Sequence, residues 1–169
     1  MINVESILLK QSELVADFFK KELRNELEQQ GHKDTGKLID SIQYDILMDS
    51  NSVKIVFEYL YYGDIVNNGV KPNKIPFGNS TGATYSKYIE ALKNWAKRKG
   101  MKKPLSAAFA IAKTHKKEGM PTKGSYKFSN NGRRKNWKTF TLESYLPQSL
   151  EIFANSDLSQ LIEIILSKK

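Results

Sequence analysis

The sequence contains no cysteine and only two histidines, His32 and His115. The absence of cysteine excludes disulfide scaffolds, thiolate zinc sites, iron–sulfur clusters and cysteine nucleophiles. No apolar run approaches the roughly 20 residues that a transmembrane helix needs, and the N-terminal segment lacks the basic-then-apolar pattern of a signal peptide. We therefore expect a protein made in a reducing cytoplasm, without membrane association, cofactor or bound metal.

Acidic residues are nearly missing from one stretch of the chain. Between Lys97 and Lys138 there are fourteen lysines and arginines but a single acid, Glu118, which is a local excess of +13. The remaining residues carry 13 basic and 17 acidic side chains, and the whole chain has a net charge of +9. A chain this asymmetric presents two electrically different surfaces, as a protein that touches DNA or joins unlike neighbours does, although such a run can also be a solvated face.

The length of 169 residues favours a single domain with appendages. A domain of this size can form a hydrophobic core that needs no disulfide or metal to stabilise it. Apolar residues recur every three or four positions from Val4 to about Gln30, which predicts one long helix that stops at Gly31. The period then changes to two in 42–48 and 53–59, which predicts a β-hairpin. Because an isolated hairpin is only marginally stable, we expect it to lie on the first helix or to join further strands.

The rest of the chain divides by composition. We expect a short helix in 60–69, an exposed loop in 70–83, a helical hairpin in 84–119 with helices near 85–99 and 104–117, a basic aromatic arm in 120–145, and a C-terminal helical segment in 146–169 that begins at about Pro147. The predicted fold for the single domain 1–169 is α+β: a long N-terminal helix packed on a small antiparallel sheet, with an inserted helical hairpin and a C-terminal helix.

Residues suited to catalysis are few. Asp45, Glu58 and Asp64, with Lys71 and Lys74 downstream, loosely resemble the acid–acid–lysine sets of metal-dependent nucleases, but alternation alone also places acids on the outer face of a hairpin. Phosphate-binding glycine loops, nucleophile elbows and zinc-binding HExxH helices are absent from the sequence. His115 lies among lysines near a helix end, where we expect a solvated capping residue.

Nucleic-acid binding has more support. The helix pair superficially resembles a helix-turn-helix, and the arm interleaves Tyr126, Phe128 and Trp137 with basic residues that could contact DNA or an acidic partner: Lys123, Lys127, Arg133, Arg134 and Lys135. The second helix, however, opens with small residues that favour close helix packing over base readout. The sequence thus favours contact with the phosphate backbone.

A third interpretation is a subunit of an assembly. Tyr59, Tyr61 and Tyr62 lie together before the loop, and the arm has aromatic residues with no obvious core to join. Aromatic residues and arginine are enriched at interface cores. The tyrosines could equally complete the packing of the sheet.

The order of motifs resembles that of a known family. Asp34-Thr35-Gly36-Lys37-Leu38-Ile39-Asp40-Ser41-Ile42 follows the first helix, Tyr61-Tyr62-Gly63-Asp64-Ile65-Val66-Asn67-Asn68-Gly69 follows the hairpin, and Ala107-Ala108-Phe109-Ala110-Ile111-Ala112-Lys113 leads to Glu118-Gly119-Met120-Pro121. This arrangement, over about residues 5–125, resembles the tail-completion or minor tail-component proteins of tailed bacteriophages.

The resemblance implies a non-enzymatic virion protein of the head–tail junction, or neck. Such a protein forms a homo-oligomeric ring around the DNA channel, next to portal or adaptor and tail proteins, and is assembled in the host cytoplasm. Gly36 would permit a tight turn, and Gly69 would end the short helix with positive φ. The alternatives that stay open are a DNA-binding protein that uses residues 97–138 and, third, a metal-dependent nuclease. The expected oligomer or partner interface comprises Tyr61, Tyr62, Val70, Pro72, Ile75, Phe77, Tyr126, Phe128 and Trp137.

Overall fold

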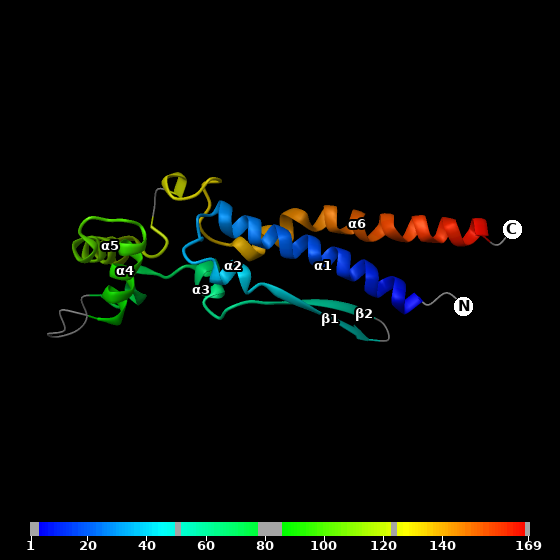
Figure 1. The fold of residues 1–169 in the computed structure, drawn as a ribbon, viewed down its shortest axis with the longest axis horizontal. Helices are drawn as coiled ribbons and strands as arrows, with labels where there is room; N and C mark the ends of the chain where they lie inside the picture. Colours follow the sequence, from blue (N-terminus) through cyan, green and yellow to red (C-terminus); the bar gives the residue numbers. More distant parts are fainter. Residues whose placement is uncertain (1–3, 50–51, 78–85, 123–124, 168–169) are drawn as a thin grey trace.

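The computed structural model describes residues 4–49, 52–77, 86–122 and 125–167, and it has an elongated α+β fold (Figure 1). Helices α1 (Val4–Gln29) and α6 (Trp137–Ser167) lie side by side, and the hairpin of β1 (Gln43–Asp49) and β2 (Ser52–Glu58) runs along α1. Helices α4 (Lys87–Arg98) and α5 (Pro104–Glu118) form the end of the molecule that is opposite to both chain termini. The predicted fold class is confirmed.

The N-terminal helix and the hairpin form as their apolar periods predict. Phe19, Leu23 and Leu27 of α1 are buried along one face of the helix. The two strands pair antiparallel, with Tyr44 opposite Phe57, and the Phe57 ring meets Phe19 edge to face at 6.5 Å between ring centroids. The hairpin is therefore stabilised by packing on α1, as a two-stranded sheet requires.

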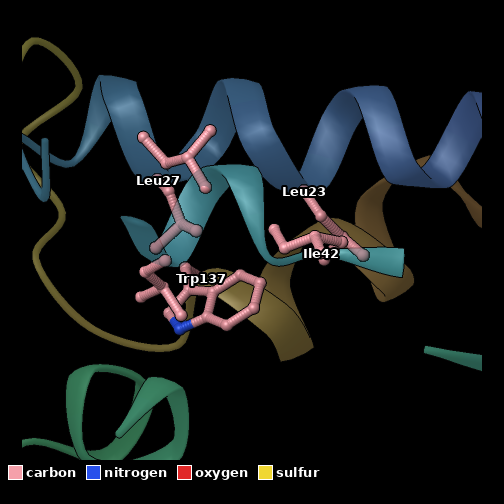
Figure 2. Packing of buried hydrophobic residues seen from close by; sticks show 6 residues of the cluster. Leu23, Leu27, Ile42 and Trp137 are labelled. Carbon is pink, nitrogen blue, oxygen red and sulfur yellow. The ribbon is translucent and has the colours of Figure 1, made fainter. Parts of the chain in front are cut away.

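The main core lies where five segments meet (Figure 2). Leu23 and Leu27 of α1 pack against Ile42 and the fully buried indole of Trp137, the first residue of α6. Two short helices, α2 (Lys37–Asp40) and α3 (Gly63–Asn68), close this core. The indole Nε1–H donates a hydrogen bond to the carbonyl oxygen of Gly63 at 3.1 Å, so that the polar atom of Trp137 is satisfied inside the core.

Two sequence expectations about the C-terminal third are wrong. Residues 137–145 are not part of an arm: α6 begins at Trp137 rather than near Pro147, and Pro147 lies inside the helix. The start of α6 is fixed by tertiary contacts, because the side chain of Asn67, on α3, accepts a hydrogen bond from the backbone N–H of Lys138 at 3.0 Å. A capping residue 71 positions away along the chain has no local sequence signal.

The α4–α5 hairpin forms as predicted and has a small core of its own. Ala108 and Ala112 of α5 are fully buried in one cluster with Ile89 of α4, so the small residues do serve close helix packing. The expected loop is partly ordered by this unit. Residues Pro72–Lys74 form a short 3-10 helix against α5, while 78–83 lie outside the described residues.

Gly36 and Gly69 adopt the backbone conformations that the sequence predicts. Gly36 has φ 80° immediately before α2, and Gly69 has φ 73° at the end of α3. A Cβ at Gly69 would also lie 2.6 Å from the carbonyl oxygen of Met120. The backbone there is thus held close to Met120, whose N–H and carbonyl pair with those of Val70.

Replacing Trp137 tests whether the main core depends on this side chain. We expect Trp137→Ala to lower the free energy of unfolding by about 3–5 kcal/mol, because it leaves a large cavity. Trp137→Phe should cost about 1–3 kcal/mol, because it removes the indole hydrogen bond to Gly63 and leaves a smaller cavity. Urea unfolding measures both. Tyr61→Ala, at a side chain that is 83% exposed, is the control and should change stability by less than about 1 kcal/mol.

Candidate functional site

The most concentrated positive charge is at the turn between α4 and α5. Lys97, Lys99, Lys102 and Lys103 are all exposed within seven residues. Arg98, between them, is held by an ion pair with Asp34. Ser86 caps α4 by accepting a hydrogen bond from the N–H of Ile89 at 3.3 Å. The four lysines therefore project from a capped, packed hairpin, and they can neutralise phosphates without reading bases.

We call these four residues the turn lysines. They lie within the basic stretch 97–138, whereas the residues that the sequence predicts to contact DNA or an acidic partner lie in the arm. In the arm, Arg133 instead forms an ion pair with Glu26, with 3.1 Å between Nε and Oε1, and its guanidinium lies 3.5 Å from the centroid of the Phe140 ring. Arg134 lies over the ring of Phe128 at 5.1 Å. Arg133 thus holds the arm on α1 and α6, whereas the Arg134 guanidinium contacts another residue of the arm. Lys127 and Lys135 are exposed, and Lys123 lies outside the described residues.

A buried carboxylate fixes the arm to α1. Glu26 accepts hydrogen bonds from Gln30 at 2.8 Å and from the side chain of Asn131 at 3.1 Å, in addition to its contact with Arg133. Gln30 also donates to the carbonyl oxygen of Lys135 at 3.0 Å. Because a buried charge is costly unless it is paired and hydrogen-bonded, this network makes the arm part of the folded structure.

Two residues expected at an exposed interface are instead buried. Trp137 lies in the main core, and Ile75 is 1% exposed beside the 3-10 helix. Both are buried by contacts with other elements. Their burial could not be predicted from the sequence, because both lie in polar segments that have no apolar period. Phe77 packs on Phe109, with 6.4 Å between ring centroids, and Val70 is half-buried beside Met120.

Other expected interface residues do lie at the surface. Tyr126 is 82% exposed, and Tyr61, Phe128 and Pro72 are also exposed. Tyr62 is half-buried and packs against the main core. The structure does not bring these residues together into one described contact cluster, since Tyr61 precedes α3 whereas Tyr126 lies in the arm.

The carboxylates considered for metal chemistry do not converge in the described parts of the chain. Asp45 and Glu58 lie on the outer face of the hairpin, where Asp45 is opposite Val56 and Glu58 is opposite Gln43. Asp64 is bound by Lys138 at 2.9 Å and by the Tyr59 hydroxyl at 2.8 Å, and these hydrogen bonds lower the pKa of the Asp64 carboxyl. Lys71 and Lys74 are exposed on the segment after α3. Within the described ranges, no three acidic or histidine side chains are placed to share a metal ion.

The two histidines are structural rather than solvated. His115 is half-buried and its Nδ1 is hydrogen-bonded to the Tyr88 hydroxyl at 2.7 Å, so the expectation of a solvated capping residue is wrong. Nε2 of His32 lies 3.2 Å from the carbonyl oxygen of Arg134, to which it donates. Burial, assisted by the nearby charge of Arg134, lowers the pKa of His32 to about 4.

The feature that the sequence did not indicate is an apolar cleft at the end of the molecule opposite α4 and α5. The cleft has a volume of about 840 Å³ and lies between the first half of α1, the tip of the hairpin and Phe153 of α6. Six of the ten residues that line it are apolar, among them Leu8, Met48 and Ile55. The other four are Ser12, Ser52, Glu5 and Asp49, so the charged residues of the lining are acidic. Alternation and helical period each predict an apolar face, but neither predicts that three such faces leave a space between them.

Comparison of the chain with protein-family models, with curated proteins and with solved structures finds no match. In the ranges that the structure describes, no helix has the length and apolarity to cross a bilayer.

The buried neutral His32 predicts a loss of stability in mild acid. Its pKa is lower in the folded protein than in the unfolded chain, so protons bind preferentially to the unfolded state, and stability falls as pH decreases from about 6.5 towards 4. For His32 alone we expect a loss of about 2 kcal/mol between pH 7 and pH 5. Urea unfolding at both pH values measures it.

The control for this prediction is His32→Gln, whose side-chain amide can still donate to the Arg134 carbonyl but does not titrate. We expect most of the loss between pH 7 and pH 5 to disappear in this variant. A smaller loss should remain, because burial also lowers the pKa of His115. An equal pH dependence in the variant and the wild type would contradict the assignment to His32.

Proposed function

We propose that this chain is a non-enzymatic structural subunit of the head–tail junction of a tailed bacteriophage, and that copies of it assemble into a ring around the DNA channel. Its neighbours in the virion are then portal or adaptor proteins and tail proteins. The observation that carries the proposal is the large unburied surface of the single chain, joined to the order of the three motifs.

The surface of the chain exceeds that of a compact monomer. A compact protein of 19.3 kDa exposes about 8,500 Å², whereas this chain exposes 11711 Å². Part of the excess is apolar, because Leu142, Leu146 and Leu150 form an exposed stripe on α6. Exposed apolar patches of this kind mark surfaces that bind other proteins. The excess favours a subunit of an assembly over a protein that acts as a monomer.

The motifs that resemble the phage family have structural roles that suit such a subunit. Leu38 and Ile39 of the first motif and Val66 of the second pack into the same core, and Ala108 and Ala112 of the third join α5 to α4. The first two motifs therefore build the main core, and the third builds the separate core of the α4–α5 hairpin.

The turn lysines favour one further role, contact with DNA. In a ring, four exposed lysines repeat with every copy, so that weak attraction per subunit gives a strong combined field on the channel. The same observation supports the second candidate, a DNA-binding protein that acts through residues 97–138 without forming a ring. The two candidates differ in oligomeric state.

The oligomeric state of the full-length chain separates these candidates. We expect light scattering to give a discrete oligomer across a range of concentrations. Negative-stain microscopy should show closed rings with an opening wide enough for duplex DNA. A chain that stays monomeric at its highest soluble concentration, with and without duplex DNA, would contradict the ring proposal. Salt-dependent DNA binding by such a monomer would favour the second candidate.

Substitution of the turn lysines tests their contact with DNA. We expect Lys97→Gln, Lys99→Gln and Lys103→Gln together to reduce the slope of log affinity against log salt by about 2 to 3, because each lost phosphate contact releases about one counterion fewer. Fluorescence anisotropy with duplex DNA across salt concentrations measures the slope. Lys10→Gln, Lys21→Gln and Lys54→Gln, which remove the same charge from exposed positions elsewhere, are the control and should leave the slope unchanged. Equal slopes in the two triple variants would argue against a specific role for the turn.

A further inference from the structure

The exposed side of α5 carries an apolar face. Leu105 and Phe109 are four residues apart on α5, so they lie on one side of the helix, and they are 42% and 37% exposed. Met101, in the turn before α5, is 37% exposed. We call these three residues the α5 face. Lys102 and Lys113, both exposed, flank this face.

The apolar cleft between α1, the hairpin tip and α6 has complementary properties. Its lining is mostly apolar, and its charged lining residues, Glu5 and Asp49, are acidic. The charge of the surrounding elements follows the same division. The α4–α5 region, residues 86–122, has ten basic and two acidic residues, whereas α1, the hairpin and α6 together have six basic and thirteen acidic ones. The two surfaces lie at opposite ends of an elongated molecule, so one copy cannot join its own two surfaces (Figure 1).

We propose that the α5 face of one copy docks in the apolar cleft of the next copy. Laying the apolar face of an amphipathic helix into an apolar groove is a common mode of protein recognition. Because the two surfaces differ, the contact is head to tail, and repeating it generates a closed ring or an open filament. The inference rests on the proposed ring function and names the interface that would build the ring.

The size of the unburied surface is consistent with this contact. A standard interface buries about 800 Å² on each partner, so a subunit that uses both its α5 face and its cleft buries about 1,600 Å². This area is within the excess of about 3,000 Å² that the chain exposes over a compact monomer of its mass. Opposite charges around the two surfaces additionally favour the head-to-tail orientation over the joining of like ends.

Two single substitutions in the full-length protein test the proposal. Leu105→Asp places a charge on the α5 face and leaves the cleft intact, whereas Met48→Asp does the reverse. We expect each to raise the dissociation constant for self-association by about 30-fold or more, which leaves monomers. An equimolar mixture should form a one-to-one heterodimer, in which the intact α5 face of Met48→Asp docks in the intact cleft of Leu105→Asp. The heterodimer should grow no further, because its two remaining surfaces both carry a substitution. Native mass spectrometry of the separate and mixed proteins identifies each species.

Neighbouring positions provide matched controls. Leu47→Asp introduces the same charge next to Met48 but on the other face of the hairpin, and Ala110→Asp does so on α5 outside the α5 face. Both control variants should assemble as the wild type does. Circular dichroism and thermal unfolding verify that all four variants are folded.

The outcomes separate this inference from the proposed function. If the wild type forms rings and both test variants form the same rings, the inference is wrong and the ring proposal stands. If the variants and their mixture behave as expected but the wild type forms open filaments, the interface stands and the ring proposal is wrong. A monomeric wild type, or a small apolar ligand retained by the wild type and lost in Met48→Asp, would overturn the inference.

Discussion

Burial of the Trp137 indole is the interaction on which the arrangement of the other elements depends. The ring fills the space between α1 and the strand residues, lies 5.4 Å from the Tyr59 ring between centroids, and donates to the Gly63 carbonyl. Because Trp137 is also the first residue of α6, its position sets where α6 begins against α1. Asn67 fixes the same point by accepting from the Lys138 N–H. One side chain thereby joins the core, the second motif and the longest helix.

The same constraint explains why the ends of the molecule are unburied. The main core lies around Trp137, and from there α1, α6 and the hairpin extend in one direction while α4 and α5 lie in the other (Figure 1). The distant ends have too few neighbours to cover their apolar residues, which leaves a cleft at one end and exposed leucine and phenylalanine at the other. An elongated scaffold whose main core is central therefore leaves two separate apolar surfaces exposed at its ends.

The sequence predicts those elements that are determined by residues close together in the chain. The long helix, the hairpin and the α4–α5 pair follow from apolar period, and the conformation of Gly36 and Gly69 follows from their place beside short helices. Contacts between distant residues were not predictable. Trp137 was assigned to an arm because its apolar neighbours come from other segments, and Arg133 was assigned to DNA because its partner, Glu26, lies 107 positions earlier. The apolar cleft was missed for the same reason, since its walls come from three elements.

The charge distribution places a further constraint on assembly. Each copy has a net charge of +9, so a ring that brought the basic ends of neighbouring copies into contact would be opposed by their repulsion. In the proposed head-to-tail contact, the basic α4–α5 end of one copy lies against the acidic cleft of the next, and the repulsion between basic ends is reduced by distance and screening. The turn lysines are not part of the α5 face, apart from Lys102 at its margin. In the proposed ring they are consequently free to face the channel, so that one helical hairpin would both join neighbours and attract phosphate.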